Sequence, residues 1–363
     1  MHSTLELSEL HDHVGRLFMI GMPGTQLDAE TRSLIRDRGV GGIILFKRNI
    51  VDPLQVATLT NDLQDAALKY HGVPLFLAVD QEGGRVARMR EPFSSFPGNS
   101  AIGDGPDSEE MAASFGRVTA MEMRLVGLNM DMAPVLDVPE GPVDRVLEGR
   151  TFGEDPSRVG HLGRIVIKVL QENGVMAVGK HFPGLGKARL DPHESLPTID
   201  ADQCEMKAVH LPPFQDAIKE GVSAIMTSHA LYPGLDEDFP ATLSYSIITE
   251  LLRKRLGLKG LIITDDLEMG AIKKDPGVAE GAVKAFEAGN DILLICEDQG
   301  LAVNAMDRLR NRLLGNEVLL SRLHESVERV MAAKERFLKG WEPVSLKRVE
   351  RYFKDKTGCY PGP

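Results

Sequence analysis

The sequence predicts an α/β fold, a single (β/α)8 barrel of the TIM type with an extra C-terminal helix. Eight short runs rich in Val, Ile, Leu and Ala are bounded by Gly or Pro, and a helical pattern follows each of them. Runs that are apolar on both faces are typical of buried parallel strands, and eight strand–helix units are the number that closes such a barrel. An open doubly wound sheet is the alternative, because it is built from the same alternating units.

The predicted strands share their apolar character and their flanking turn residues. In chain order they cover residues 17–22, 41–46, 75–80, 128–135, 175–181, 222–229, 261–265 and 291–296.

Helix start and stop residues support the segments between these strands. Asp155 precedes Pro156, which is an N-cap before proline at the first helical position, and Gly174 follows Asn173 at a helix end. The predicted helices cover residues 29–38, 53–70, 108–126, 156–173, 205–220, 246–256, 278–288 and 302–314.

The C-terminal part of the chain continues beyond the eighth unit. A further helical pattern at residues 320–338 is expected to pack outside the barrel. Residues 339–363 contain Lys, Gly and Pro, and we expect them to be loosely held. The predicted organisation is therefore one barrel domain, residues 1–340, followed by a C-terminal tail, residues 341–363.

Composition and charge narrow the class of protein. Of the 363 residues 42% are hydrophobic and 26% are charged, which is typical of a soluble globular protein. The formal net charge of −11 and the lack of a basic stripe argue against a nucleic-acid partner. The start of the chain has no basic, apolar leader, and no apolar run approaches the roughly 20 residues of a membrane span. We expect a cytoplasmic protein that does not bind membranes.

The three cysteines, Cys204, Cys296 and Cys359, are far apart in the sequence and odd in number. They form no zinc-binding or disulfide pattern, and unpaired thiols fit a reducing compartment. No H-E-x-x-H motif is present, and no G-x-G-x-x-G follows a strand. We therefore expect neither a metal nor a cofactor.

Polar clusters follow several predicted strands where these strands end. In barrel enzymes the chemistry takes place at the C-terminal ends of the strands, and an unpaired charge is costly to bury in a core. The clusters are Asp80-Gln81-Glu82-Gly83-Gly84-Arg85, Lys180-His181, Ser228-His229, Asp265-Asp266 and, in the loop after the fifth strand, Asp191-Pro192-His193.

Two of these clusters allow more than one interpretation. The carboxylates, glycines and arginines of residues 80–90 suit a polyhydroxylated ligand, and they equally suit an ion-paired strand end. Lys180 can be a Schiff-base lysine or a structural lysine paired with an acid. No phosphate-binding turn is evident near the last two strands, which argues against a sugar-phosphate aldolase.

Asp191 and His193 are two residues apart, so in an extended segment they point the same way. Asp191 can then orient the imidazole and raise its basicity, as a carboxylate does for a catalytic histidine. An incidental pair in a solvated loop is the alternative.

Asp265 is a further candidate for a catalytic residue, and it ends a strand that is rich in β-branched residues. Adjacent strand residues face opposite ways, so only one of Asp265 and Asp266 is expected to point into the pocket. An aspartate is a competent nucleophile toward an anomeric carbon, and a glycosidase needs an acid beside its nucleophile. Asp265 and His193 can supply that pair.

These residues belong to a longer series of motifs, which resembles glycoside hydrolase family 3 and, within it, the bacterial single-domain β-N-acetylglucosaminidase (β-hexosaminidase) branch. The resemblance runs from about residue 15 to residue 295. The matching stretches are D-Q-E-G-G-R-V-A-R at 80–88, M-A-P-V-L-D-V at 132–138, G-R-T-F-G at 149–153, K-H-F-P-G at 180–184, D-P-H-E-S-L-P at 191–197, P-A-T-L-S at 240–244 and I-T-D-D-L-E-M at 263–269.

The resemblance implies a retaining exo-β-N-acetylglucosaminidase that acts through a covalent glycosyl-Asp intermediate. Asp265 matches the nucleophile, His193 the general acid/base and Asp191 its partner. The residues that match those holding the N-acetylglucosamine ring are Asp80, Arg88, Arg150, Lys180 and His181. The implied substrate is a small carbohydrate, a fragment of cell-wall muropeptide, with no obligatory protein partner.

Three alternatives remain open beside this activity. The first is another β-glycosidase of the family, a β-glucosidase or a β-xylosidase. The second is a β-N-acetylglucosaminide phosphorylase, and the third is a non-catalytic sugar-binding barrel.

The chain departs from the family pattern at two positions in the loop after the fifth predicted strand, residues 182–197, which we call the catalytic loop. Leu185 stands where the family commonly has the histidine of G-H-G, and Pro192 stands where it commonly has the serine of D-S-H. Proline fixes φ and lacks an amide donor, so this loop is expected to be stiffer or differently poised.

Overall fold

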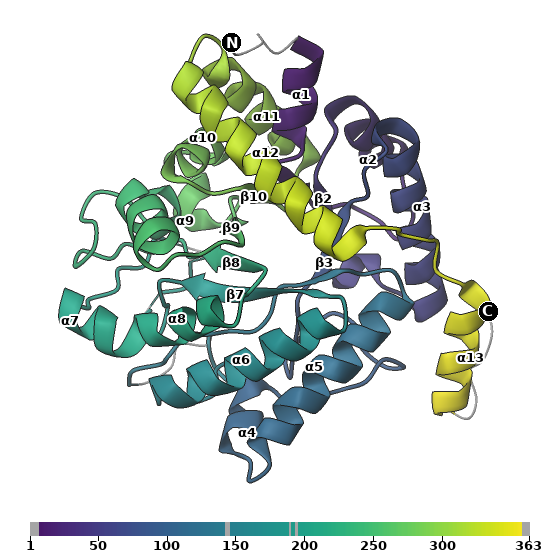
Figure 1. Cartoon of the computed structure of the whole chain (residues 1–363), viewed down its shortest axis with the longest axis horizontal. Coiled ribbons are helices and arrows are strands. Elements are labelled where there is room, and N and C mark those ends of the chain that lie inside the picture. The colour runs from purple at the N-terminus through teal and green to yellow at the C-terminus, as the bar shows by residue number, and fades with distance from the viewer. Residues whose placement is uncertain (1–6, 142–145, 189, 193–194, 358–363) are drawn as a thin grey trace.

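The computed structural model describes residues 7–141, 146–188, 190–192 and 195–357. Its centre is a closed barrel of eight parallel strands, in which each strand pairs with the next along the chain and the last pairs with the first (Figure 1). The strands are β1 (Phe18–Ile20), β2 (Gly42–Leu45), β3 (Phe76–Val79), β6 (Met130–Asp131), β7 (Met176–Phe182), β8 (Ala224–Thr227), β9 (Leu261–Asp266) and β10 (Ile292–Ile295). Every predicted strand overlaps one of these, so the barrel is confirmed and the open sheet is wrong.

Helices cover the outside of the barrel, and each predicted helix overlaps an observed one. The main helices are α3 (Pro53–His71), α5 (Ser108–Leu125), α6 (Pro156–Glu172), α8 (Leu211–Lys219), η5 (Ser246–Arg255), α10 (Val278–Ala288), α11 (Gln299–Leu313) and α12 (Glu317–Leu338). The shorter segments are α1 (Leu7–Gly15), α2 (Ala29–Ser33), η1 (Leu34–Arg38), η2 (Lys47–Asn49), α4 (Asn99–Asp104), α7 (Gln203–Glu205), η3 (Met206–His210), η4 (Ala241–Leu243) and α9 (Gly270–Lys273). Among the described residues, no helix has the length and apolar character needed to cross a bilayer.

Aspartate side chains fix where several helices begin. The carboxylates of Asp52, Asp155 and Asp298 accept hydrogen bonds from backbone N–H groups in the first turns of α3, α6 and α11. In α3 and α6 a proline follows the cap, at a position where its missing N–H costs nothing. Each of these helices therefore starts at the residue after its aspartate.

Helix α12 closes the N-terminal end of the barrel. The buried Lys334 side-chain nitrogen donates to the carbonyls of Gly41 at 2.9 Å and Pro74 at 2.7 Å, just before β2 and β3. Ser326 donates to Asp291 at 2.7 Å, just before β10. The C-terminal ends of the strands lie at the opposite end, which α12 leaves uncovered.

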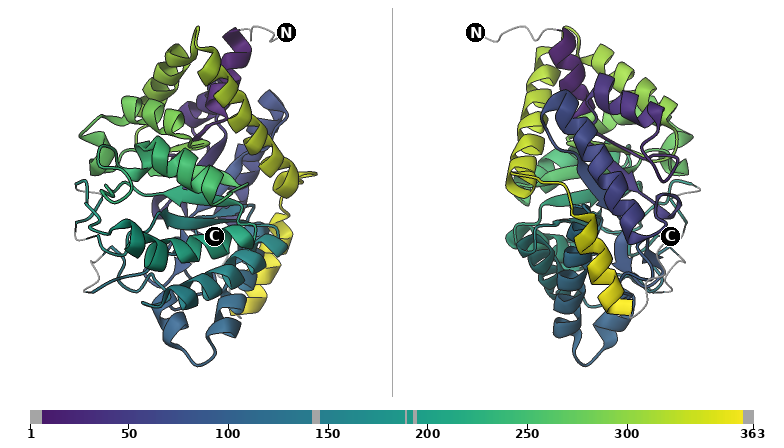
Figure 2. Two further views of the ribbon diagram at one scale, coloured as in Figure 1. Left: turned by 60° about the vertical axis from the view of Figure 1, so that its left-hand side comes forward. Right: turned by 90° about the vertical axis from the view of Figure 1, so that its right-hand side faces the viewer.

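The expectation of a loosely held tail is wrong for residues 346–357, which form helix α13 (Leu346–Thr357) beside α3 (Figure 2). Val349 and Phe353 are buried, and Tyr352 and Lys356 both bond the Glu122 carboxylate. These four residues follow the i, i+3, i+4, i+7 spacing of one helix face, which is what lets α13 pack. The division into residues 1–340 and 341–363 stays a prediction.

Candidate active site

The predicted site residues meet in one cavity at the C-terminal ends of the barrel strands. Its volume is about 220 Å³. Residues from five of the seven sequence motifs line it: Asp80, Arg88, Arg150, Lys180, His181, Pro192 and Asp265. Since such pockets commonly hold about 300–1,000 Å³ when they enclose a whole drug-sized ligand, this cavity suits a smaller body such as one sugar ring.

Lys180 is the centre of an ion-pair network on one wall of the cavity. Its Nζ lies 2.9 Å from Asp80 Oδ1 and 2.6 Å from Glu82 Oε1, and its side chain is 2% exposed. Burial acts to lower the pKa of Lys180, but the two carboxylates outweigh it and hold the pKa above its usual value. Lys180 is therefore a paired ammonium rather than the neutral amine that Schiff-base chemistry requires.

Arginines extend the network in both directions. Arg150 binds Glu82 with two hydrogen bonds of 2.8 Å, and Arg88 lies 3.2 Å from Asp80 Oδ2. Burial acts to raise the pKa of Glu82, but Lys180 and Arg150 lower it to about 2. The same competition, with Lys180 and Arg88 as the cations, puts the pKa of Asp80 below its usual range.

Glu82 was not singled out in the sequence as a site residue. It lies in the hairpin formed by β4 (Gln81–Gly83) and β5 (Val86–Ala87), and it is not one of the residues that line the cavity. It is 1% exposed and holds both Lys180 and Arg150. The signal in the sequence that points to Glu82 is its location directly after Asp80-Gln81, at the end of a predicted strand.

A second buried carboxylate, Asp137, orients His181. Because a carboxylate only accepts, His181 Nδ1 carries the proton and donates to Asp137 Oδ2 at 2.7 Å. The other oxygen of Asp137 accepts the backbone N–H of Leu185 at 2.7 Å. Asp137 therefore fixes the ring and the first turn of the catalytic loop together, although its position in the 132–138 motif had not marked it as functional.

Strand β9 brings both Asp265 and Asp266 to the cavity. The expectation that only one of them points inward is wrong, because Ile263 pairs with Ile292 and Asp266 with Leu294, which leaves β9 one residue longer than β10 between these pairs. Such a bulge breaks the alternation of side chains. Asp265 Oδ1 accepts the N–H of Asp266 at 2.8 Å.

The environment of Asp266 favours its protonated form. Burial raises the pKa of Asp266 to about 7, and the neighbouring charges of Glu268 and Asp265 act in the same direction. The cavity thus contains a second aspartate that changes charge near neutral pH.

Ser228 and His229 do not line the cavity, but they form hydrogen bonds with segments that do. His229 Nε2 donates to the carbonyl of Asp266 at 2.9 Å, and its Nδ1 lies 2.8 Å from the Thr242 hydroxyl, which donates to the carbonyl of Ser228. Burial lowers the pKa of His229, so the ring is neutral. Ser228 bonds Tyr232, whose hydroxyl donates to the carbonyl of Gly184 at 3.0 Å. These buried polar groups fix the end of β9 and the start of the catalytic loop.

The catalytic loop reaches the cavity through Leu185 and Pro192, which both line it. The carbonyl of Pro192 accepts the N–H of Ala271 at 3.2 Å, so the segment with Asp191 is tied to α9. His193 lies outside the described residues, and its role stays a prediction.

Comparison with known proteins gives a consistent family. The profile described as "Glycosyl hydrolase family 3 N terminal domain" matches residues 9–333. A "Beta-hexosaminidase" of Tolumonas auensis is 38% identical over 81% of this chain and 86% of the relative. "Beta-hexosaminidase A" of Pseudoalteromonas piscicida is also 38% identical, and the match covers 75% of this chain and 48% of that longer protein.

Solved structures agree with the sequence comparison. A glycoside hydrolase family 3 β-N-acetylglucosaminidase from Paenibacillus sp. superposes with a TM-score of 0.89 at 37% identity, over 98% of this chain and 69% of that one. A β-N-acetylhexosaminidase from Beutenbergia cavernae gives a TM-score of 0.84 at 28% identity, over 92% and 99% of the two chains. The profile match, the relatives and the barrel geometry together establish that this chain belongs to glycosyl hydrolase family 3.

Proposed function

We propose that the protein is a retaining exo-β-N-acetylglucosaminidase. The observation that carries the proposal is the cavity itself, which gathers Asp265, Asp80, Arg88, Arg150, Lys180 and His181 around a space suited to one sugar ring. The relatives named β-hexosaminidase, which match about four fifths of this chain, support the same activity.

The charged wall suits a polyhydroxylated ring. Asp80 can accept from sugar hydroxyls, while Arg88, Arg150 and Lys180 can donate charge-assisted hydrogen bonds. Because His181 Nδ1 donates its proton to Asp137, Nε2 of the same ring can accept a hydrogen bond from a sugar hydroxyl in the cavity. A cavity of this size at the barrel end accommodates one terminal sugar residue, which supports exo action.

The chemistry that we propose is a double displacement. Asp265 attacks the anomeric carbon and forms a glycosyl ester, while His193 protonates the departing glycosidic oxygen. Water then attacks the anomeric carbon, His193 removes its proton, and Asp265 leaves as a carboxylate. Asp191 orients the imidazole; its segment reaches the cavity through Pro192, which supports this assignment.

The biological substrate that we propose is a cell-wall muropeptide fragment with a terminal N-acetylglucosamine, met in the cytoplasm. Cys204 and Cys296 are free thiols, which is compatible with a reducing compartment. No membrane or nucleic-acid partner is part of the proposal.

A panel of aryl β-glycosides tests the proposed activity. Turnover is expected to be highest with the N-acetylglucosaminide, and to be independent of inorganic phosphate. Faster turnover of the glucoside or xyloside would make the protein another β-glycosidase. A rate that depends on phosphate, with a sugar 1-phosphate as product, would make it a phosphorylase, and no turnover of any member would leave a sugar-binding barrel.

A further inference from the structure

We infer that Glu140, Glu205 and His210 form a binding site for a transition-metal dication, of which Zn²⁺ is the best fit, beneath the catalytic loop. One potential ligand atom of each residue lies within 4.8 Å of those of the other two. None of these residues lines the sugar cavity. The inference therefore stands independently of the proposed function.

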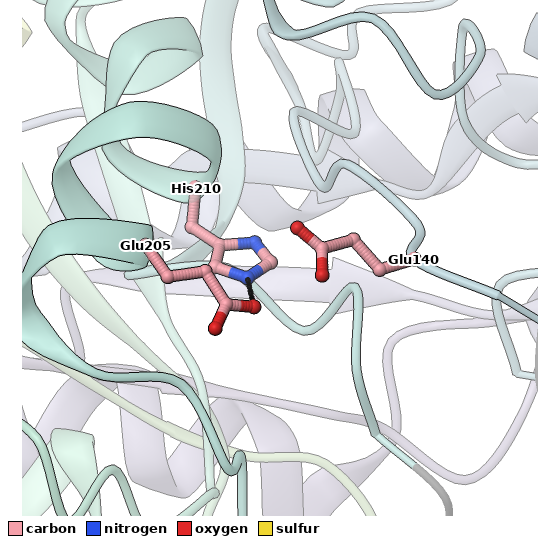
Figure 3. Close-up of side chains that lie close together, drawn as sticks. All are labelled: Glu140, Glu205 and His210. Carbon is pink, nitrogen blue, oxygen red and sulfur yellow. Dashed lines mark ion pairs between the residues drawn. The ribbon is translucent and has the colours of Figure 1, made fainter.

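The three side chains converge from two separate parts of the barrel. Glu140 lies in the loop after β6, Glu205 ends α7, and His210 ends η3. Figure 3 shows the imidazole between the two carboxylates, with Glu140 reaching toward it from the side opposite the helical turn that carries Glu205. A metal ion there would join segments that the sequence separates by 65–70 positions.

His210 is the observation that points to a ligand. Its side chain is 0% exposed, and neither ring nitrogen has a hydrogen-bond partner among the described residues. Buried polar groups in native proteins are nearly always partnered, and an orphan is frequently explained by an ion or an ordered water.

The spacing of the donors fits an ion better than a direct contact. His210 Nε2 and Glu205 Oε1 are 3.9 Å apart, which is too long for a hydrogen bond. Two metal–ligand bonds of about 2.0–2.2 Å span that separation. An imidazole with two carboxylates is a zinc-like donor set, whereas Mg²⁺ and Ca²⁺ prefer oxygen ligands alone.

The ammonium of Lys187 lies beside the two carboxylates and would compete with a metal ion for them. Its ammonium contacts Glu205, lies 3.4 Å from Glu140 Oε2, and donates to the carbonyl of Asp200 at 3.1 Å. The Lys187 side chain is 27% exposed, so it can swing into solvent when a dication takes its place. Metal binding is thus an exchange of one cation for another between the same carboxylates.

This exchange would act on the base of the catalytic loop. The N–H of Glu140 donates to the carbonyl of Gly186, and a Cβ at Gly184 would meet His210 at 3.0 Å. Lys187 itself lies four residues before Asp191. Occupancy by the metal therefore releases Lys187 and anchors the preceding turn through Glu140 and His210 instead.

Calorimetric titration of the whole protein with Zn²⁺ in a chelator-free buffer tests the inference. Glu205→Gln and His210→Gln are each expected to weaken binding by about tenfold or more, because the first replaces a charged carboxylate ligand by a neutral amide and the second removes the imidazole. Glu205→Gln changes a partly exposed side chain, so it stays informative even where His210→Gln fails to fold. Lys187→Met is expected to tighten binding, because it removes the competing ammonium.

Two controls separate this site from others. His161 and Glu109 form an exposed pair at 2.9 Å, so His161→Ala is expected to leave the titration unchanged. Zinc held by the catalytic loop would be lost in Asp191→Asn, whereas zinc held here survives that change. Equal affinity of wild type, Glu205→Gln and Lys187→Met would overturn the inference, as would loss of all binding in Asp191→Asn.

Discussion

Lys180 Nζ, on the wall of the cavity, and Glu82 Oε1 are 2.6 Å apart, and both side chains are almost completely buried. Two buried charges at this distance depend on each other, because removing one leaves the other without compensation. The pair therefore fixes the wall on which Asp80, Arg88 and Arg150 are arranged.

Glu82→Gln is expected to destabilise the protein by about 3 kcal/mol, since it leaves Lys180 and Arg150 short of a counter-charge. Chemical unfolding at pH 7 measures this. Glu250→Gln, in an exposed pair with Lys254 at 2.6 Å, is the matched control and is expected to change little. Equal effects of the two substitutions would show that the network does not stabilise the fold.

Glu82 is also expected to make the stability of the protein depend on pH in the acid range. The pKa of Glu82 is lowered to about 2 in the folded protein, below its ordinary value of 4.5. Its contribution is therefore present above pH 4.5 and is lost as the pH falls toward 2. The difference in unfolding free energy between wild type and Glu82→Gln is expected to shrink over that window, and a constant difference would contradict the assignment.

Asp137→Asn is expected to lower kcat/KM by about tenfold to a hundredfold, the equivalent of the 1.5–3 kcal/mol of a hydrogen bond to a charged group. The neutral amide of asparagine does not select one tautomer of His181, and it accepts the Leu185 N–H without the negative charge of the carboxylate. Asp137→Glu, which keeps the carboxylate, is the conservative control. If Asn and Glu variants retain full kcat/KM, Asp137 does not position the site.

The contribution of Asp266 to stability is expected to change with pH in the direction opposite to that of Glu82. The folded pKa of Asp266, about 7, exceeds its ordinary value of 3.8, so the contribution of Asp266 to the stability of the fold is lost as the pH rises from 3.8 to 7. Asp266→Asn, which mimics the neutral acid, is expected to become more stable relative to wild type across this range. Urea unfolding at pH 4.5 and pH 8 checks the trend, and a relative stability that falls instead would refute it.

His193→Ala is expected to slow substrates with poor leaving groups far more than activated aryl glycosides, because an activated phenolate needs little protonation. Asp191→Asn is expected to show the same pattern more mildly, since the imidazole remains without its charged partner. Rates over a series of substituted phenols give the measurement. A small, equal slowing across the series would assign the acid/base role to another residue.

The sequence predicted the barrel well because its eight strands are apolar on both faces and are separated by recognisable helix caps. It failed where structure depends on distant partners. The bulge in β9 arises from its register with β10, and the few apolar residues of α13 are scattered among many charged ones, which hides its amphipathic face in the sequence.

The site shows the same division. Residues directly at strand ends, such as Asp80 and Asp265, were identifiable from local pattern. Asp137 and Glu82 were not, because the groups that they hold lie 44 and 68 positions away along the chain. The environment that raises the pKa of Asp266 depends likewise on tertiary packing.

The most direct test of the central claim is mass spectrometry of the protein after reaction with a slow, fluorinated N-acetylglucosaminide. The account predicts one covalent sugar on the peptide that contains Asp265, present also in Asp266→Asn and absent in Asp265→Asn. A sugar on any other residue, or turnover with full activity in Asp265→Asn, would contradict the account.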